Sequence, residues 1–360
     1  MAISPVKACL HFFLLAFPVL AISIAGCASG PVRHAKPGPP EPYMRVQRPD
    51  AETVQLQIAV RKFLPARGHG PVVWLAGASH IGETNYYASL QIHLNAQTLV
   101  LYEGVGEHPR KPRHRTGIKS PSVPTPATHA PADKTSGGAS LQMTMARSLG
   151  LVFQLQAIDY ERTNFCNSDL SVAQIQALMQ PERKVVSGDA GSAQPRQGDA
   201  DDSSFQELLG AMDGSSVFGA LANGIFQIIG SSTKLQAMTK LALIEVFGQI
   251  RGDMAQMQGL PPEMKRLFEV LIRERNKVVI ADLKEELRHA ARGDSLVVFY
   301  GAGHLVDMEK RLRHELRYVP VEEFWLPVFS VNTEKAGLSN FELSLLRSLL
   351  RSQLAPLNGE

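Results

Sequence analysis

The chain has 360 residues, of which 44% are hydrophobic and 20% charged, a composition that can build a sizeable hydrophobic core. Its formal net charge of +3 is small, and we find no basic stripe with interleaved aromatic residues, so the sequence argues against a nucleic acid partner. Of three cysteines, Cys9 and Cys27 lie near the amino terminus, which excludes a disulfide within the folded part. We interpret Cys166 as a packing residue because no activating partner lies near it in the sequence.

Residues 1–26 are typical of a signal peptide. Lys7 precedes an apolar stretch, 8–24, which runs into the small residues Ala25-Gly26 and then Cys27. This ending resembles the bacterial lipobox, which implies that Cys27 is lipidated and anchors the protein to a membrane. Resemblance to lipoproteins of Gram-negative bacteria further implies an outer-membrane protein facing the periplasm. The alternatives are a plain cleaved signal or a membrane-spanning anchor, and Pro18 within the apolar stretch argues against the latter.

The segment 27–52 is rich in proline, so we interpret it as a tether that holds a folded domain away from the membrane. The folded domain is expected over 53–330. Apolar, β-rich runs that are closed by glycine or by polar residues predict buried strands. We expect them at 72–75, 98–102, 153–158, 296–300 and 319–329.

Helical patterns alternate with these runs. We expect helices at 84–96, 141–149, 262–291 and 307–316, a helical block or cap at 205–257, and an amphipathic tail helix within 331–360. Two polar segments, 110–138 and 187–204, have little to bury and are predicted to be flexible inserts. Strands that alternate with helices indicate an α/β domain whose sheet is mostly parallel and flanked by helices.

Four of the expected strands end in a residue that can do chemistry. Two of them end in related turns, Gly-Ala-Ser-His at 77–80 and Gly-Ala-Gly-His at 301–304, and the other two end at Glu103 and Asp159. Parallel strands present their carboxyl ends along one edge of the sheet, where ligands bind in open α/β folds. We therefore expect His80, His304, Glu103 and Asp159 to approach one another. Each residue alone is equally typical of an ordinary turn.

The set of motifs resembles the TraB/PrgY/GumN group, which is related to the Tiki metalloproteases and more distantly to ChaN-like and erythromycin esterase-like proteins. The shared pattern is a first strand that ends Gly-x-x-His, a second that ends in Glu, and a last that ends Gly-x-Gly-His. Arg275-Asn276 is similar to the arginine-bearing helix of that group. The resemblance covers roughly residues 72–304, with a poorly matched middle block.

The resemblance implies a catalytic and metal-binding cluster of His80, Glu103 and His304, with Arg275 also catalytic. Imidazoles and a carboxylate suit Mn, Co, Zn or Fe, and such an ion activates water and polarises a carbonyl group. Arg275 would then hold a substrate carboxylate or a developing oxyanion. The alternative is that it forms a salt bridge with Glu103 or Asp159. Without a metal, His80 and Glu103 would pair as a general base and an orienting carboxylate.

Four further residues are expected to border the cluster. Asn276 adjoins Arg275, and Tyr160 follows Asp159. Glu83 either replaces or assists Glu103, or only favours the amino terminus of the next helix. Asp159 either lines the site or caps a turn.

These features predict a lipid-anchored, metal-dependent hydrolase of the cell envelope that acts on a peptide or on a related amide or ester. The first alternative is a non-catalytic lipoprotein that captures a peptide or small-molecule ligand. A third possibility, from the resemblance to ChaN-like lipoproteins, is the handling of haem or iron.

Overall fold

The computed structural model describes residues 40–104, 137–179, 217–250, 252 and 262–358, and all of them belong to one unit, Pro40–Glu360. The predicted signal peptide, the lipidation site Cys27, the insert 187–204, and most of the insert 110–138 lie outside the described residues. Within the described part, no helix is long and apolar enough to cross a membrane.

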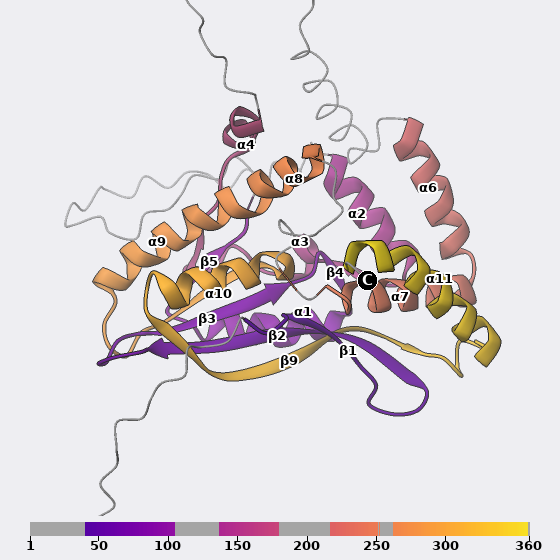
Figure 1. The fold of residues 1–360 in the computed structure, drawn as a ribbon, viewed down its shortest axis with the longest axis horizontal. Helices are drawn as coiled ribbons and strands as arrows, with labels where there is room; N and C mark the ends of the chain where they lie inside the picture. Colours follow the sequence, from indigo (N-terminus) through magenta and orange to yellow (C-terminus); the bar gives the residue numbers. More distant parts are fainter. Residues whose placement is uncertain (1–39, 105–136, 180–216, 251, 253–261, 359–360) are drawn as a thin grey trace, which may run out of the picture. The chain divides into compact units, whose positions relative to one another are not determined.

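Seven strands form one mixed sheet with the order β1-β2-β3-β8-β5-β7, and β9 pairs with the other side of β2 (Figure 1). The strands are β1 (Met44–Gln47), β2 (Thr53–Pro65), β3 (Val72–Ala78), β5 (Leu99–Tyr102), β7 (Phe165–Asn167), β8 (Ser295–Gly301) and β9 (Tyr318–Asn332). The neighbours β3, β8, β5 and β7 are parallel, whereas β1 and β9 run antiparallel to β2 and β2 antiparallel to β3. The α/β fold with helices on a largely parallel sheet is confirmed.

Helices cover both faces of this sheet. They are α1 (Thr84–Asn95), α2 (Gly137–Ser148), α3 (Gln154–Ala157), α4 (Val172–Met179), α6 (Val217–Gly230), α7 (Thr233–Phe247), α8 (Pro262–Phe268), α9 (Arg275–His289), α10 (Leu305–His314) and α11 (Asn340–Asn358). A π-helical segment, η2 (Glu269–Glu274), joins α8 to α9, and a 3-10 turn, η3 (Ala302–His304), precedes α10. The long helix predicted at 262–291 is therefore present as one continuous helical run over 262–289 that contains a π-helical turn.

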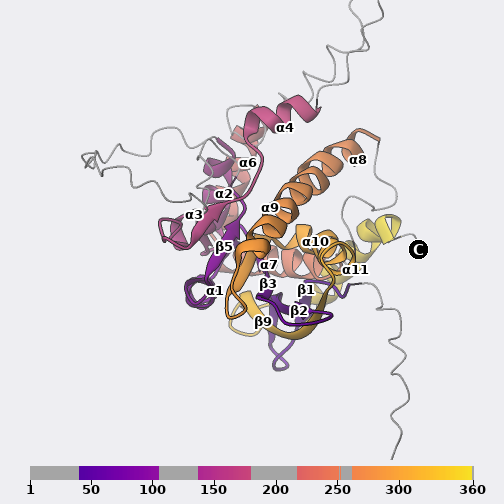
Figure 2. The same ribbon diagram turned by 90° about the vertical axis from the view of Figure 1, so that its left-hand side faces the viewer.

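The alternation of side chains along the strands explains the two layers of core. On β8, Val297 and Phe299 join the cluster that contains residues of α1, α2 and α7. Val298 and Tyr300 point the other way and join the cluster with α9 and α10. Figures 1 and 2 show α9 and α10 beside each other, and in Figure 2 β5 is seen between α1 and α9. With both faces covered, the central strands are apolar throughout, as parallel strands require.

The predicted boundary of the domain at residue 53 is wrong. Met44–Gln47 forms strand β1 and pairs with β2, and Tyr43 is buried. The tether therefore ends before this strand, because the short run Met44-Arg-Val-Gln can complete hydrogen bonds along the free part of the edge of β2.

The strand predicted at 153–158 is also wrong. Residues Val152–Phe153 form β6, which pairs with β4 (Ile81–Gly82) in a separate two-stranded sheet, and the chain then turns into α3. Gln-Leu-Gln-Ala is a sequence of helix formers, and Leu155 is exposed instead of buried in a sheet. The fourth parallel strand is β7, which comes later in the chain.

Candidate functional site

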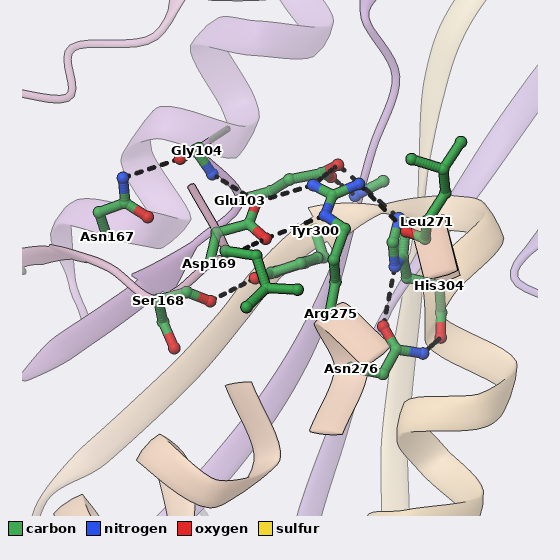
Figure 3. Close-up of polar contacts among 12 residues, drawn as sticks. Glu103, Gly104, Asn167, Ser168, Asp169, Leu271, Arg275, Asn276, Tyr300 and His304 are labelled. Atoms are coloured by element: carbon green, nitrogen blue, oxygen red, sulfur yellow. Dashed lines mark hydrogen bonds and ion pairs between the residues drawn. The ribbon is translucent and has the colours of Figure 1, made fainter. Parts of the chain in front are cut away.

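The four parallel strands end at one edge of the sheet, and a polar residue follows each of them. His80 follows β3, Glu103 follows β5, Asp169 follows β7, and His304 lies in η3 directly after β8. Arg275, the first residue of α9, reaches this edge from the helical layer (Figure 3). The structure thus brings Glu103, His304 and Arg275 together as predicted, with Asp169 in the position expected for Asp159.

Glu103 is bound at both carboxylate oxygens. Its Oε2 accepts a hydrogen bond of 2.7 Å from the backbone N–H of Gly301, and its Oε1 lies 2.6 Å from Nη2 of Arg275. A side chain at position 301 would crowd the carboxylate, because a Cβ atom there would lie 3.2 Å from Oε2. The glycine that ends β8 therefore has a specific role, since it lets the backbone donate to Glu103 at close range.

Asp169 holds the guanidinium of Arg275 in a two-pronged contact. Its Oδ1 lies 2.9 Å from Nε and its Oδ2 lies 2.7 Å from Nη2, while Nη1 donates to the backbone oxygen of Leu271. Oδ2 of Asp169 also accepts from the N–H of Gly104. All three guanidinium nitrogens are therefore engaged (Figure 3). Of the two predicted roles for Arg275, this geometry favours the salt bridge with Glu103 over the capture of a substrate carboxylate.

The ionisation of this group follows from its charges. Burial alone would raise the pKa of Glu103, but the adjacent charge of Arg275, together with His304, His80 and the Gly301 hydrogen bond, holds that pKa well below its usual range. Burial alone would lower the pKa of Arg275, and its two carboxylate partners raise it above the usual value. Both groups are charged at neutral pH. Two carboxylates and one guanidinium leave this part of the site with a net negative charge, which favours a cation.

His304 is buried and has one defined tautomer. The Nδ2 atom of Asn276 donates to the backbone oxygen of His304 and to Oδ2 of Asp307, so its Oδ1, 2.8 Å from Nδ1 of His304, must accept. Nδ1 of His304 therefore carries the proton, and Nε2 has a free lone pair when the ring is neutral. Burial lowers the pKa of His304, partly opposed by the charge of Glu103, and this favours the neutral ring.

The Nε2 atom of His304 faces Oε1 of Glu103 across 3.7 Å. This is too long for a hydrogen bond. Two ligands that are each about 2.1 Å from one ion at a tetrahedral angle lie roughly 3.4 Å apart, so the spacing suits a shared ion or a bridging water. The chemistry of the pair, a neutral imidazole and an ionised carboxylate, also suits a divalent metal.

His80 is less fixed than the other two predicted ligands. Its side chain is exposed, and a positive charge on its ring would lower the pKa of both Glu103 and His304. The turn that carries His80 is well held, because Tyr86 and Tyr87 donate to the backbone oxygens of Gly77 and Ser79. The described residues contain no group of three or more His, Cys, Asp or Glu side chains already arranged around one ion. Glu103 and His304 thus fit an ion as a pair, and His80 does not complete a group of three with them.

The residues predicted to border the site have different outcomes. Asn276 orients His304, as described above. Tyr160 packs on Tyr102 with ring centroids 4.9 Å apart, and Glu103 contributes to raising its pKa, after burial as the main cause, so it lies near the site. Cys166 is half-buried in β7 and packs against the core formed with α9 and α10.

Glu83 and Asp159 do not join the cluster. Oε1 of Glu83 accepts from the N–H and the hydroxyl group of Ser330, so it ties the start of α1 to β9. Asp159 is exposed and its Oδ1 caps the N–H of Glu161, which is the turn-capping alternative. Asp159 comes two residues after the end of α3, so it does not follow a strand of the sheet.

Sequence reasoning missed Asp169 and Asp307. The strand before Asp169 has only three residues, Phe-Cys-Asn, and none is β-branched, so no pattern marked it. Asp307 follows the Gly-Ala-Gly-His turn by three residues, and this spacing within the first turn of α10 was the available signal.

Comparison of the chain with models of known families, with curated proteins and with solved structures found no match. The resemblance to the TraB/PrgY/GumN group therefore remains a prediction from the motifs.

Proposed function

We propose that this chain is a hydrolase of the cell envelope that cleaves a peptide or a related amide or ester bond, with Glu103 and His304 at its reaction centre and His80 beside them. The observation that carries the proposal is the lone pair of His304 Nε2, which faces an ionised carboxylate oxygen at 3.7 Å. A water molecule bound between these two atoms would be polarised by both of them.

The reaction follows from the protonation states. As the water oxygen forms a bond with the carbonyl carbon, its proton passes to Nε2 of His304, and the adjacent charge of Glu103 stabilises the imidazolium. The same proton is then given to the leaving nitrogen or oxygen as its bond to carbon breaks. Arg275 keeps Glu103 ionised throughout, and Asn276 and Asp307 keep the imidazole in the tautomer that can accept the proton.

In a second route to the same hydrolysis, Glu103 Oε1, His304 Nε2 and His80 would hold a divalent ion of Mn, Co, Zn or Fe. The lone pair of Nε2 would then be used for the ion, so the ion would replace His304 in the activation of water. When bound, such an ion would lower the pKa of the water molecule bound to it and polarise the carbonyl group of the substrate. The membership in the TraB/GumN-like group, the lipid on Cys27 and the outer-membrane location are parts of the same proposal that rest on the sequence motifs.

The test is an assay of the purified full chain against mixed peptides and chromogenic esters, with and without added Mn²⁺, Co²⁺ or Zn²⁺. His304→Gln and Glu103→Gln should each lower hydrolysis at least about 100-fold, because removal of a general base or its partner has effects of that order. The matched control is His69→Gln, since His69 is exposed in the turn before β3, at the opposite end of that strand. No hydrolysis by the unmodified chain, or full activity in His304→Gln, would overturn the proposal.

A second candidate is the capture of a peptide or small-molecule ligand without catalysis. It is favoured by the finding that the described residues do not form a ready three-residue metal group. Peptide that binds to the unmodified chain, is recovered intact, and still binds to Glu103→Gln would support this candidate over hydrolysis.

A further inference from the structure

A stripe of exposed apolar side chains runs along helix α11. Phe341 is 73% exposed, Leu345 is 48% exposed and Leu349 is 55% exposed. Successive members are four positions apart, so they are neighbours on one face of the helix. Leu343 and Leu346 pack toward the core instead. We call the three exposed residues the α11 stripe.

The polar side chains next to the α11 stripe include serines whose hydroxyl groups are already hydrogen-bonded. Oγ of Ser344 donates to the backbone oxygen of Phe341, and Oγ of Ser352 donates to that of Leu349, each at 2.8 Å. A hydroxyl group that is bonded within its own helix loses little when water is removed from it. These two serines therefore add little cost to the transfer of the stripe into an apolar medium.

The helix α11 and the helix α7 on which it packs carry an excess of positive charge (Figure 1). With the arginine bound to them, they have five cationic side chains and two carboxylates, namely Lys234, Lys240, Arg48, Arg347 and Arg351 against Glu245 and Glu342. Glu245 contacts both Arg48 and Arg347, so one carboxylate serves two guanidinium groups. Within the described part of the chain, Lys240 and Arg351 form no ion pair. This excess attracts anionic lipid headgroups.

The proposed lipid anchor would keep this surface close to a membrane. The 13 peptide steps from Cys27 to Pro40 span at most about 45 Å. A surface that is tethered at such a distance meets the membrane at a high effective concentration, so a weak intrinsic affinity is sufficient for binding. A tether of this length sets a distance and not an orientation.

We infer that the α11 stripe docks on an anionic lipid membrane, with α11 in the plane of the headgroups and its basic neighbours at their phosphates. Interfacial helices of this kind combine phenylalanine and leucine on one face with arginine and lysine beside them. Docking supplies the orientation of the domain that the tether does not. No residue of the proposed reaction centre lies on α7 or α11, so the inference goes beyond the proposed hydrolysis and uses the proposed anchor only for its proximity to the membrane.

Co-sedimentation of residues 40–360, which form one unit with its own core, with phosphatidylcholine vesicles that contain phosphatidylglycerol tests this inference. This unit lacks Cys27, so neither lipidation nor hydrolysis affects the result. The double variant Leu345→Ser, Leu349→Ser should bind about 100-fold more weakly, because the burial of each leucine contributes about tenfold. Ile92→Ser is the matched control, since Ile92 is 72% exposed on α1.

The charges give a second readout. Binding should be at least about tenfold weaker to vesicles of phosphatidylcholine alone and should decrease as salt is added, because the attraction between basic side chains and anionic headgroups is then lost or screened. Arg351→Gln should weaken binding about fivefold, the effect of one basic residue near the membrane surface. Lys284→Gln, at an exposed position of α9, should leave binding unchanged. Circular dichroism of each variant establishes that it is folded.

The inference is overturned if the unmodified unit does not bind anionic vesicles at millimolar lipid. Equal binding by the double leucine variant, or equal binding to vesicles without phosphatidylglycerol, would also contradict it. Self-association that requires Leu345 and Leu349, without binding to vesicles, would show that the stripe serves a protein partner and would overturn it as well.

Discussion

This protein has two buried clusters in which an arginine binds two carboxylates. The clusters differ in whether a neighbouring side-chain atom is left available to a ligand. At the carboxyl edge of the sheet, Arg275 binds Glu103 and Asp169. In the other cluster, Arg61 of β2 contacts Glu309 of α10 at 2.6 Å and Glu323 of β9 at 2.8 Å.

The second cluster is saturated by parts of the protein. One oxygen of Glu309 accepts from Arg61 and from the Tyr43 hydroxyl, and the other accepts from Arg313. Arg61 also donates to the backbone oxygens of residues 41 and 42. These contacts hold residues 41–43 against β2 and α10, so this cluster has a structural role. We call it the clasp.

In the first cluster, by contrast, Nε2 of His304 faces Oε1 of Glu103 at 3.7 Å, and no hydrogen bond joins these two atoms. A positive charge on the exposed ring of a second histidine, His80, would lower the pKa of Glu103. A buried ion pair by itself therefore says little about function. The informative feature is an open lone pair next to a charge, which a substrate, water or an ion can use.

The largest effect is expected in the clasp. Arg61→Met should lower the free energy of unfolding by about 3 kcal/mol, the lower end for a broken buried ion pair, because Glu309 would stay buried with Arg313 as its remaining cation. Hydrogen exchange at Tyr43 and in β1 should also accelerate. Urea denaturation measures the first effect, and Lys62→Met is the control, since the neighbouring pair Lys62–Glu322 is solvent-exposed and should contribute no more than about 1 kcal/mol. Similar losses in the two variants would refute the assignment of a clasp.

The next effect concerns Asp169. Asp169→Asn should destabilise the fold by about 2 kcal/mol, in the range found for hydrogen bonds to charged groups. It should also impair hydrolysis, because Arg275 loses the contact that places it against Glu103. Unfolding and activity can be measured on the same sample. A stable variant with normal activity would show that the clamp on Arg275 is dispensable.

His93 extends the comparison. Its ring nitrogen Nε2 lacks a hydrogen-bond partner, but unlike Nε2 of His304 it has no charged group beside it. Its Nε2 is buried without a hydrogen-bond partner, between the rings of Trp74 and Phe324, and burial lowers its pKa to about 4. The unfolded chain, with a histidine pKa near 6.5, binds the proton first as the pH falls. Stability should therefore decrease between pH 6.5 and 4, by about 2 kcal/mol after allowance for partial exposure, and then level off.

His93→Phe should remove this part of the pH dependence while hydrolysis is unchanged. Chemical denaturation at pH 7, 5.5 and 4.5 gives the slope for both proteins. If the two slopes are the same, His93 is not the group that titrates.

The smallest effect is expected at Asp159. Asp159→Ala should change stability by less than about 0.5 kcal/mol and leave activity unchanged, because the side chain is exposed and caps only a turn. A large loss of activity in this variant would mean that Asp159 acts in the site despite its position.

The sequence predicted the fold class and three of the four strand-end residues correctly, because long apolar strands with glycine turns mark His80, Glu103 and His304. It could not reveal Asp169, because the three residues of β7 are too few to show a pattern. The prediction therefore assigned the fourth strand-end position to Asp159. Nor could it show the clasp, because Arg61 and Glu309 are 248 positions apart and meet only through the packing of α10 on the sheet. The roles of Asn276 and Arg275 depend on side-chain geometry at the start of α9.

The most direct test of the Glu103–His304 centre is a titration of the purified full chain with Co²⁺, followed by its visible absorption. The proposal predicts one bound ion per chain, with affinity at least 100-fold weaker in His304→Gln and Glu103→Gln and unchanged in His69→Gln. His80→Ala should also weaken binding. Equal Co²⁺ binding by the unmodified chain and His304→Gln, or no binding at millimolar Co²⁺, would contradict a shared ion site between these residues.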